Sequence, residues 1–222
     1  MIKTGKVVET TNEGVTIFVP FSTHDYMKEY KPDVLVEFDD GNCITQLQRK
    51  KAHALIRDIS LWWSYTPMEA TKEITKMMFR SNEPSLHADM FSLSDCDRTT
   101  ARLYITYLID FCVLHGVPTR DKLYEVCEDM EKYVWACLMT KTCCVCGLPH
   151  ADLHHVDAIG SGRNRNHVLQ IGMPALSLCR RHHMQSHALG QQSFLDRYHL
   201  TPLPITDEIG KVYNLSNANL GG

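Results

Sequence analysis

Residues 143–147 read CCVCG, and residues 178–187 read LCRRHHMQSH. These stretches contain one Cys-x2-Cys pair and one Cys-x2-His pair, whose members are Cys143, Cys146, Cys179 and His182. Two such pairs, with 32 residues between them, have the ligand types and spacing of a closed structural zinc site. We therefore expect these four side chains to bind one Zn²⁺. Cys144 is spare in this arrangement, although a register shift would let it replace Cys143.

The histidines nearby form a second group with a different geometry. His183 and His187 are four residues apart, which places both on one face of a helix. His154 and His155 lie in an alternating stretch typical of a strand, so their side chains point to opposite faces. One of the two can hold an ion while the other performs a different task. The alternative is that these histidines are ordinary core residues, which is disfavoured because a core gains nothing from so many polar rings.

The order of these residues resembles the motif of the HNH endonucleases, in which a β-hairpin and a helix (ββα-metal) surround one divalent ion. The resemblance rests on the two Cys/His pairs, His154-His155, the helix start at 178–183, and His187. It implies that His154, His183 and His187 bind the catalytic ion and that His155 is the general base. It also implies that Cys143, Cys146, Cys179 and His182 form the zinc knuckle found in many members.

Two positions depart from the pattern of that family. The second pair of the knuckle usually ends in cysteine, and this chain has His182, a nitrogen ligand that zinc also accepts. The asparagine that steadies the loop behind the base is replaced by Pro174, and Asn164 or Asn166 is the expected substitute. This loss leaves a second interpretation open, in which the segment is a zinc-stabilised module that binds DNA without cutting it. A zinc-finger regulator is disfavoured because four histidines would be surplus.

The residue types suit phosphodiester hydrolysis. A histidine with a pKa near 6.5 can deprotonate water around neutral pH, and one divalent ion can stabilise the leaving oxygen. The ion is expected to be Mg²⁺, Mn²⁺, Ni²⁺ or Zn²⁺, and three histidine ligands favour the softer ions over Mg²⁺. Arg163 and Arg165 follow Gly160 and Gly162 in the expected hairpin loop, where they can clamp a DNA phosphate. A solvated turn is the equally weighted alternative.

The net charge, the cysteine distribution and the apolar runs indicate the class of protein to which this chain belongs. The net charge is −3 overall, but residues 139–222 carry 7 Lys/Arg against 5 Asp/Glu, which is the sign that a phosphate partner requires. Five of the nine cysteines are scattered singly, which favours thiols over disulfides. The longest apolar run, residues 133–139, is far shorter than the ~20 residues of a membrane span, and the N-terminus has no apolar signal core. We therefore expect a cytoplasmic protein without membrane contact.

The pattern along the chain predicts an α+β protein, with N-terminal strands followed by a helical bundle and then the small zinc-stapled ββα-metal domain. Alternation predicts strands at residues 6–9, 15–19 and 34–38. Helical periodicity predicts helices at residues 25–30, 45–62, 67–78, 94–115 and 118–137, and Ser94 or Asp95 is the expected N-cap of the helix at 94–115. We expect domain boundaries at 1–138, 139–201 and 202–222, the last being a loosely packed C-terminal tail.

Residues 1–138 resemble the phage Orf (NinB) recombination mediators, through the stretches 45–60 and 103–117. Some phage members of that family are fused to a C-terminal HNH domain. The resemblance implies a homodimer that binds single-stranded DNA and acts with the host single-strand-binding protein and a recombinase, in the host cytoplasm. The HNH domain adds duplex or branched DNA as a partner. Arg49, Lys50 and Arg57 are candidate contacts to the DNA backbone, the alternative being a solvated helix face.

Overall fold

The computed structural model describes residues 6–11, 14–18, 42–64, 66–82, 91–156 and 169–215, and it divides into two compact units, residues 1–39 and 40–222. In the first unit, β1 (Lys6–Thr11) and β2 (Gly14–Phe18) form an antiparallel hairpin. The first two expected strands are thereby confirmed. The helix predicted at 25–30 and the strand predicted at 34–38 lie outside the described residues.

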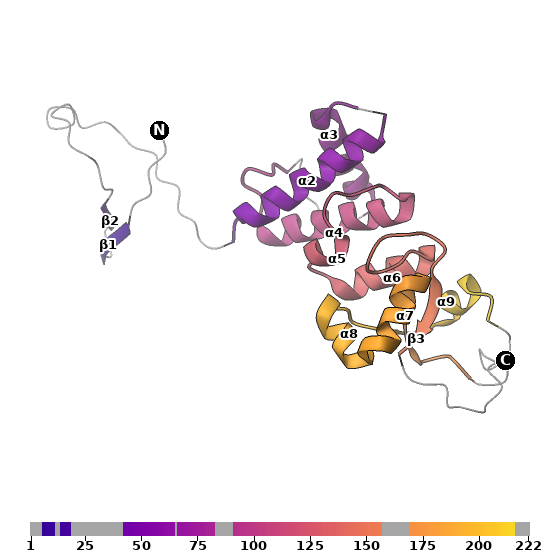
Figure 1. Cartoon of the computed structure of the whole chain (residues 1–222). Helices are drawn as coiled ribbons and strands as arrows, with labels where there is room; N and C mark the ends of the chain where they lie inside the picture. The colour runs from indigo at the N-terminus through magenta and orange to yellow at the C-terminus, as the bar shows by residue number, and fades with distance from the viewer. Residues whose placement is uncertain are drawn as a thin grey trace, which may run out of the picture. The chain divides into compact units, whose positions relative to one another are not determined.

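The second unit begins with three helices that pack on one another: α2 (Gln46–Trp62), α3 (Met68–Asn82) and α4 (Arg98–His115) (Figure 1). Thr45 starts α2 with a capping box, since its hydroxyl accepts from the Gln48 N–H and the Gln48 side chain accepts from the Thr45 N–H. The N-cap of α4 is Asp97, two or three residues later than expected. Gly116 ends α4 in a left-handed conformation, which glycine commonly adopts after the last turn of a helix.

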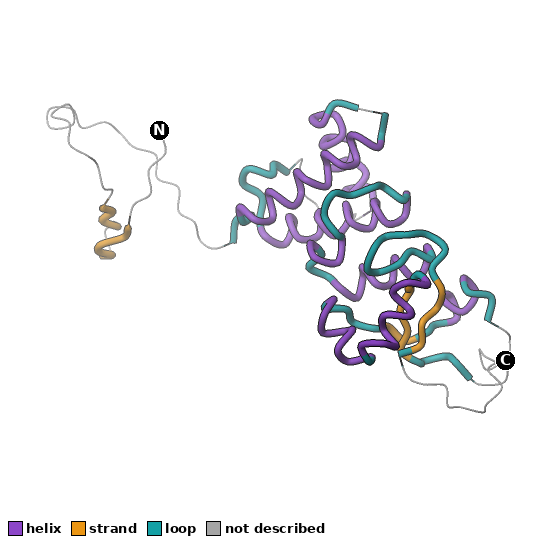
Figure 2. Tube along the Cα trace, viewed as in Figure 1, coloured by secondary structure: helices purple, strands orange, loops and turns teal. Residues whose placement is uncertain are grey.

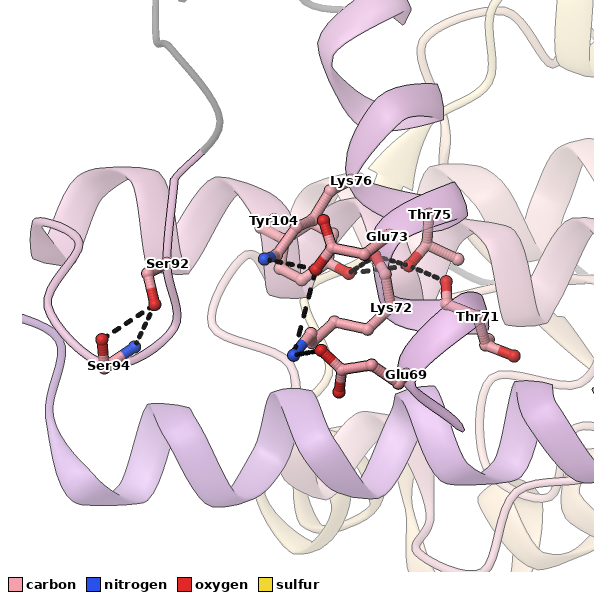
Figure 3. A network of polar contacts seen from close by, with 9 residues as sticks. All are labelled: Glu69, Thr71, Lys72, Glu73, Thr75, Lys76, Ser92, Ser94 and Tyr104. Carbon is pink, nitrogen blue, oxygen red and sulfur yellow. Dashed lines mark hydrogen bonds and ion pairs between the residues drawn. The ribbon is translucent and has the colours of Figure 1, made fainter. Parts of the chain in front are cut away.

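A polar network joins α3 to α4 inside this helical part (Figure 3). The hydroxyls of Thr75 and Tyr104 lie 2.7 Å apart, and both residues are fully buried. Lys76 is also buried, and its ammonium group lies 3.1 Å from a Glu73 carboxylate oxygen and over the ring of Phe91. Because each buried polar group has a partner, the network stabilises the helix packing instead of opposing it.

The prediction of a single helix over 118–137 is wrong, because the structure has two helices in this region, α5 (Leu123–Val126) and α6 (Met130–Thr140). Cys127 is extended, and Asp129 begins a new helix by accepting from the Lys132 N–H at 3.1 Å. Glu128 in the break accepts from Lys51 of α2. An N-cap aspartate and a tertiary contact therefore interrupt a stretch whose apolar spacing is continuous.

The C-terminal part is a three-stranded antiparallel sheet with short helices, drawn in Figure 2. Its elements, in chain order, are β3 (Asp152–His155), β4 (Pro174–Leu178), α7 (Arg180–Leu189), α8 (Gln191–Tyr198), β5 (Leu203–Pro204) and α9 (Asp207–Val212). The sheet order is β3-β4-β5, and α7 packs on both β3 and β4 (Figure 1). The hairpin and helix of a ββα unit are present, and the α+β class is confirmed.

The expectation of a loosely packed C-terminal tail is wrong. Ile205 and Ile209 are each 1% exposed, and the Ile205 N–H donates to the Met173 carbonyl at 3.0 Å. The hydroxyl of Tyr213 donates to the Ser177 hydroxyl of β4 at 2.8 Å. Residues 203–215 thus pack against the fold, and Ile205 and Ile209 belong to its core.

The boundary expected at residue 138 falls within α6, which packs against α4 as well as against β4, β5 and α9. Independent folding of residues 1–138 stays a prediction. Among the described helices, none is both long enough and apolar enough to cross a membrane.

Candidate metal centre

A tight turn positions the first cysteine pair. The Cys143 N–H donates to the Leu148 carbonyl at 2.8 Å, and the Gly147 N–H donates to the Cys143 carbonyl at 2.9 Å. Gly147 has a φ of 69°, a left-handed conformation that glycine adopts without steric cost. The Cys144 N–H donates to the Ser177 carbonyl of β4 at 2.9 Å, which anchors the turn beside the sheet.

The structure brings the four predicted knuckle residues together. Cys143 and Cys146 come from the turn, Cys179 is the N-cap of α7, and His182 lies in its first turn. One ligand atom from each lies within 4.8 Å of all the others. The sulfurs of Cys146 and Cys179 are 3.7 Å apart, and Nδ1 of His182 is 3.3 Å from the sulfurs of both Cys143 and Cys179.

These distances match a tetrahedral zinc site. With Zn–S of ~2.3 Å and Zn–N of ~2.05 Å, a tetrahedron has S···S edges of about 3.8 Å and S···N edges of about 3.6 Å. All nine cysteines are free thiols, so the short sulfur contact is not a disulfide. Burial raises the pKa of Cys143 to about 12, so a bound cation must displace its proton. The donor set therefore fits a structural zinc ion.

Cys144 lies outside this group, although it is as buried as Cys143. Its thiol contacts the thiol of Cys137 in α6, and its carbonyl accepts from the Tyr133 hydroxyl at 2.8 Å. Adjacent side chains in the turn point in different directions. Of the two cysteines that the sequence left open, the structure therefore places Cys143, and not Cys144, in the cluster.

A second cluster is formed by His154 of β3 and by His183 and His187 of α7. Their ring centroids lie 4.7 to 5.4 Å apart, and one ring nitrogen from each lies within 4.8 Å of the others. His182, next to His183, faces the cysteines instead. The α7 helix thus presents ligands to two separate centres from adjacent positions, because neighbouring residues are about 100° apart around a helix.

His154 has the environment of a metal ligand. It is 1% exposed, and its Nδ1 has no hydrogen-bond partner among the described residues. Its Nε2 lies 3.0 Å from the Gln191 side-chain oxygen and 3.3 Å from the Ser186 hydroxyl. Burial lowers the pKa of His154 to about 4, so the ring is neutral at pH 7. A buried, neutral imidazole beside two further histidines, with one ring nitrogen that has no partner among the described residues, fits a divalent cation.

His155 occupies the other face of β3, as its alternation with His154 predicts. Its Nε2 lies 2.9 Å from the side-chain oxygen of Gln170, which is only 5% exposed. Both residues line a cleft of about 530 Å³, together with Lys141, His150, Asp152 and Tyr213. The sequence did not point to Gln170. Asn164 and Asn166, the residues expected to support the base, lie outside the described part of the chain.

The residues predicted to bind DNA differ in their exposure and in their hydrogen-bond partners. Arg163 and Arg165 lie outside the described residues. Arg49 donates to the backbone carbonyls of Leu93 at 2.8 Å and Ser94 at 2.5 Å, so it fastens a loop to α2. Arg57 donates to the Asp58 carboxylate at 3.3 Å. Lys50 is exposed on α2.

One basic residue was missed. Arg180 is exposed and lies three and seven residues before His183 and His187, which places it on the helix face that carries these two histidines. Its side chain is directed toward the N-terminus of α7, since helical side chains tilt that way. The i, i+3, i+7 spacing of Arg180, His183 and His187 is the sequence signal that identifies this residue.

Comparison with known proteins gives one finding. A family model described as "Putative HNHc nuclease" matches residues 21–216 and so includes both clusters. No curated protein and no solved structure matches the chain.

Proposed function

The chain belongs to this family of HNH nucleases, and from that premise we propose that it is a metal-dependent endonuclease that hydrolyses phosphodiester bonds in DNA. The observation that carries the proposal is the cluster of His154, His183 and His187, in which Nδ1 of the buried His154 has no hydrogen-bond partner within the described part of the chain. A buried polar atom without a partner is costly, and a bound cation offsets that cost.

We assign different roles to His154 and His155, and their opposite orientations on β3 support this assignment. His154, with His183 and His187, would hold one divalent ion, which supplies charge neutralisation at the scissile phosphate and at the leaving oxygen. His155, on the other face of β3, is the proposed general base. An imidazole in a cleft can take a proton from water and pass it on to solvent.

The four Cys/His ligands serve a structural purpose in this proposal. They connect the turn before β3 to the start of α7, and α7 carries two of the three histidine ligands. A zinc ion at this position fixes α7 relative to β3, and therefore fixes the distance between His154 and its two partners. Four protein ligands leave no open coordination position, as in structural zinc sites.

The helical part is proposed to bind single-stranded DNA as a recombination mediator, following its resemblance to the Orf family. A homodimer that acts in phage recombination with the host single-strand-binding protein is part of the same proposal. Lys50 is the best candidate contact of the three predicted in this region, because Arg49 and Arg57 are already paired within the fold. Support for this second activity comes from the resemblance and not from a preformed site.

The direct test is incubation of the zinc-loaded protein with supercoiled, linear and branched DNA in Mg²⁺, Mn²⁺, Ni²⁺ or Zn²⁺, with EDTA as the control. We expect cleavage that depends on the added ion, with Mn²⁺ or Ni²⁺ more effective than Mg²⁺ because all three ligands are nitrogens. DNA binding without cleavage in every ion would instead support the non-catalytic module that the sequence left open.

A further inference from the structure

The cleft beside β3 contains two basic side chains to which the proposed mechanism gives no role. Lys141 directly follows the last turn of α6, and His150 lies two residues before the start of β3. Both residues line the cleft of about 530 Å³, in which Lys141 is half-buried and His150 is exposed. Because β3 also carries the proposed base in the same cleft, we ask which ligand these two side chains fit.

The backbone brings Lys141 and His150 to the cleft in a fixed arrangement. Lys141 has a φ of 52° and His150 a φ of 58°, both in the left-handed region that residues other than glycine seldom adopt. The Lys141 carbonyl accepts from the Ala151 N–H at 2.7 Å, which ties the residue after His150 to Lys141. The Lys141 N–H in turn donates to the carbonyls at the end of α6. Such conformations persist only where the surrounding structure holds them, and they are frequent at binding sites.

The ammonium group of Lys141 keeps its hydrogen-bond donors available. It lies 5.2 Å from the centre of the Tyr213 ring, and the Tyr213 hydroxyl holds that ring in place by donating to Ser177 at 2.8 Å. In the described part of the chain, no carboxylate and no carbonyl of α6 lies within bonding distance of this ammonium. A cation over an aromatic ring is oriented without using its N–H groups, so Lys141 can donate them to a ligand.

The ligand that suits this arrangement is an anion with several acceptor oxygens. A lysine ammonium attracts a phosphate as a point charge, and the ring N–H of His150 adds a donor. Asp152 also lines the cleft and repels an anion, but among the described residues it forms no ion pair with Lys141. A DNA strand that reaches the proposed base must pass this cleft, and the phosphates of that strand are the anions that it brings.

We propose that Lys141 and His150 form a phosphate-binding subsite for the DNA strand, which takes a backbone phosphate flanking the scissile one. The inference rests on the proposed function, because it assumes that the strand is the substrate. It requires neither the ring of His155 nor a bound ion, since both subsite residues precede β3. Free inorganic phosphate has the same chemistry, and the experiments below separate it from the strand.

The first experiment measures binding without cleavage. The full chain is used with one equivalent of zinc at the knuckle and no second ion, and fluorescence anisotropy follows labelled DNA at several salt concentrations. Lys141→Gln removes the charge, Lys141→Arg keeps it, and His150→Asn removes the ring while suiting the left-handed backbone. Asp152→Asn removes the opposing carboxylate. Lys132→Gln is the matched control, because Lys132 is exposed in the first turn of the same helix, at its other end.

We expect Lys141→Gln to weaken DNA binding and to lower the slope of log K against log salt by about 1, the effect of one lost phosphate contact. Lys141→Arg should keep the slope of the wild type, His150→Asn should weaken binding, and Asp152→Asn should tighten it. Lys132→Gln should leave the slope unchanged. An unchanged slope with a lower melting temperature in Lys141→Gln would make Lys141 a helix-end residue and overturn the proposal. Equal losses in Lys141→Gln and Lys132→Gln would also overturn it.

The second experiment locates the phosphate with DNA that the wild type cuts at a defined bond. Single phosphates on either side of that bond are replaced by neutral methylphosphonates, and the KM and kcat of cleavage are compared. We expect one flanking replacement to raise the KM of the wild type and to have no further effect in Lys141→Gln. Additive effects at every position would overturn the proposal.

Two further outcomes separate the alternatives. Inorganic phosphate, added at constant ionic strength, should not displace DNA from the wild type, because it lacks the other contacts of the strand. Displacement that disappears in Lys141→Gln would assign the subsite to free phosphate and overturn its assignment to DNA. If the wild type binds DNA and cuts none, the nuclease function fails, while the salt slopes still decide whether Lys141 contacts a phosphate.

Discussion

The sulfur atoms of Cys146 and Cys179 lie 3.7 Å apart, although 32 residues separate them in the chain. Most of the intervening residues form β3, β4 and the connection between these strands. The knuckle therefore closes the ends of the hairpin segment against each other, and α7 starts directly at the closure. Whatever disrupts the knuckle must also disturb His183 and His187, which follow in the same helix.

Two adjacent cysteines provide a matched test of the zinc site. Cys143 and Cys144 are both fully buried, and only Cys143 belongs to the cluster. Cys143→Ala should abolish the bound zinc and lower the melting temperature strongly, since binding of a structural zinc contributes directly to folding. Cys144→Ala should keep one zinc per chain and lose only about 1–2 kcal/mol from the lost packing. Metal analysis and thermal unfolding measure both. Loss of zinc in Cys144→Ala alone would show that the register is wrong.

The lowered pKa of His154 predicts a specific dependence of stability on pH. Burial moves this pKa from 6.5 to about 4 in the folded chain. Between these values the unfolded chain binds a proton that the folded chain does not, so the free energy of unfolding falls as the pH decreases from 6.5 toward 4. His154→Leu removes the group and should show a smaller decrease. Urea unfolding between pH 5 and 7, without an ion at the histidine cluster, measures the difference. Parallel profiles for the two proteins would contradict the prediction.

Arg180 should contribute to DNA affinity through a phosphate contact, because it shares a helix face with His183 and His187. Arg180→Gln should weaken binding to every DNA sequence and reduce the slope of log K against log salt by about 1. Arg197→Gln is the control, because Arg197 is also exposed but lies on α8 over the ring of Tyr198. Fluorescence anisotropy at several salt concentrations gives both slopes. If both substitutions weaken DNA binding equally, the loss of affinity comes from the change in net charge alone.

Local signals account for much of what the sequence predicts correctly. The capping box at Thr45 and the left-handed Gly116 set helix ends through contacts within a few residues, and such contacts are visible in the sequence. The break between α5 and α6 was missed because the apolar spacing continues through it, and because one of its two causes is the contact of Glu128 with Lys51, 77 residues away. Likewise, Ile205 and Ile209 flank the polar residues 206–208, and their burial depends on packing against the rest of the fold.

The same distinction between local signals and tertiary contacts applies to the candidate site. Ligand residues could be chosen from spacing, since pairs such as His183 and His187 are brought together by the helix itself. Gln170 and Gln191 could not be chosen, because a glutamine has no characteristic spacing and acts only through a tertiary contact. Arg49 was predicted as a DNA contact because the helical part resembles a family that binds single-stranded DNA and a cation can neutralise a phosphate. In the fold, however, the carbonyls of Leu93 and Ser94 lie within its reach.

The decisive test of the nuclease mechanism compares His155 with His183. His155→Ala removes the proposed base and leaves both clusters complete, so zinc content, Ni²⁺ affinity and DNA binding should stay close to the wild type. Cleavage should fall by ~10²–10⁴, the usual cost of losing a general base, and excess metal should not restore it. His183→Ala should also lose cleavage, but through loss of the ion, so that a higher metal concentration restores part of the activity. Single-turnover cleavage across a metal titration separates the two. Equal cleavage by the wild type and His155→Ala would remove His155 from the mechanism, whereas metal rescue of His155→Ala would make it a ligand instead of the base.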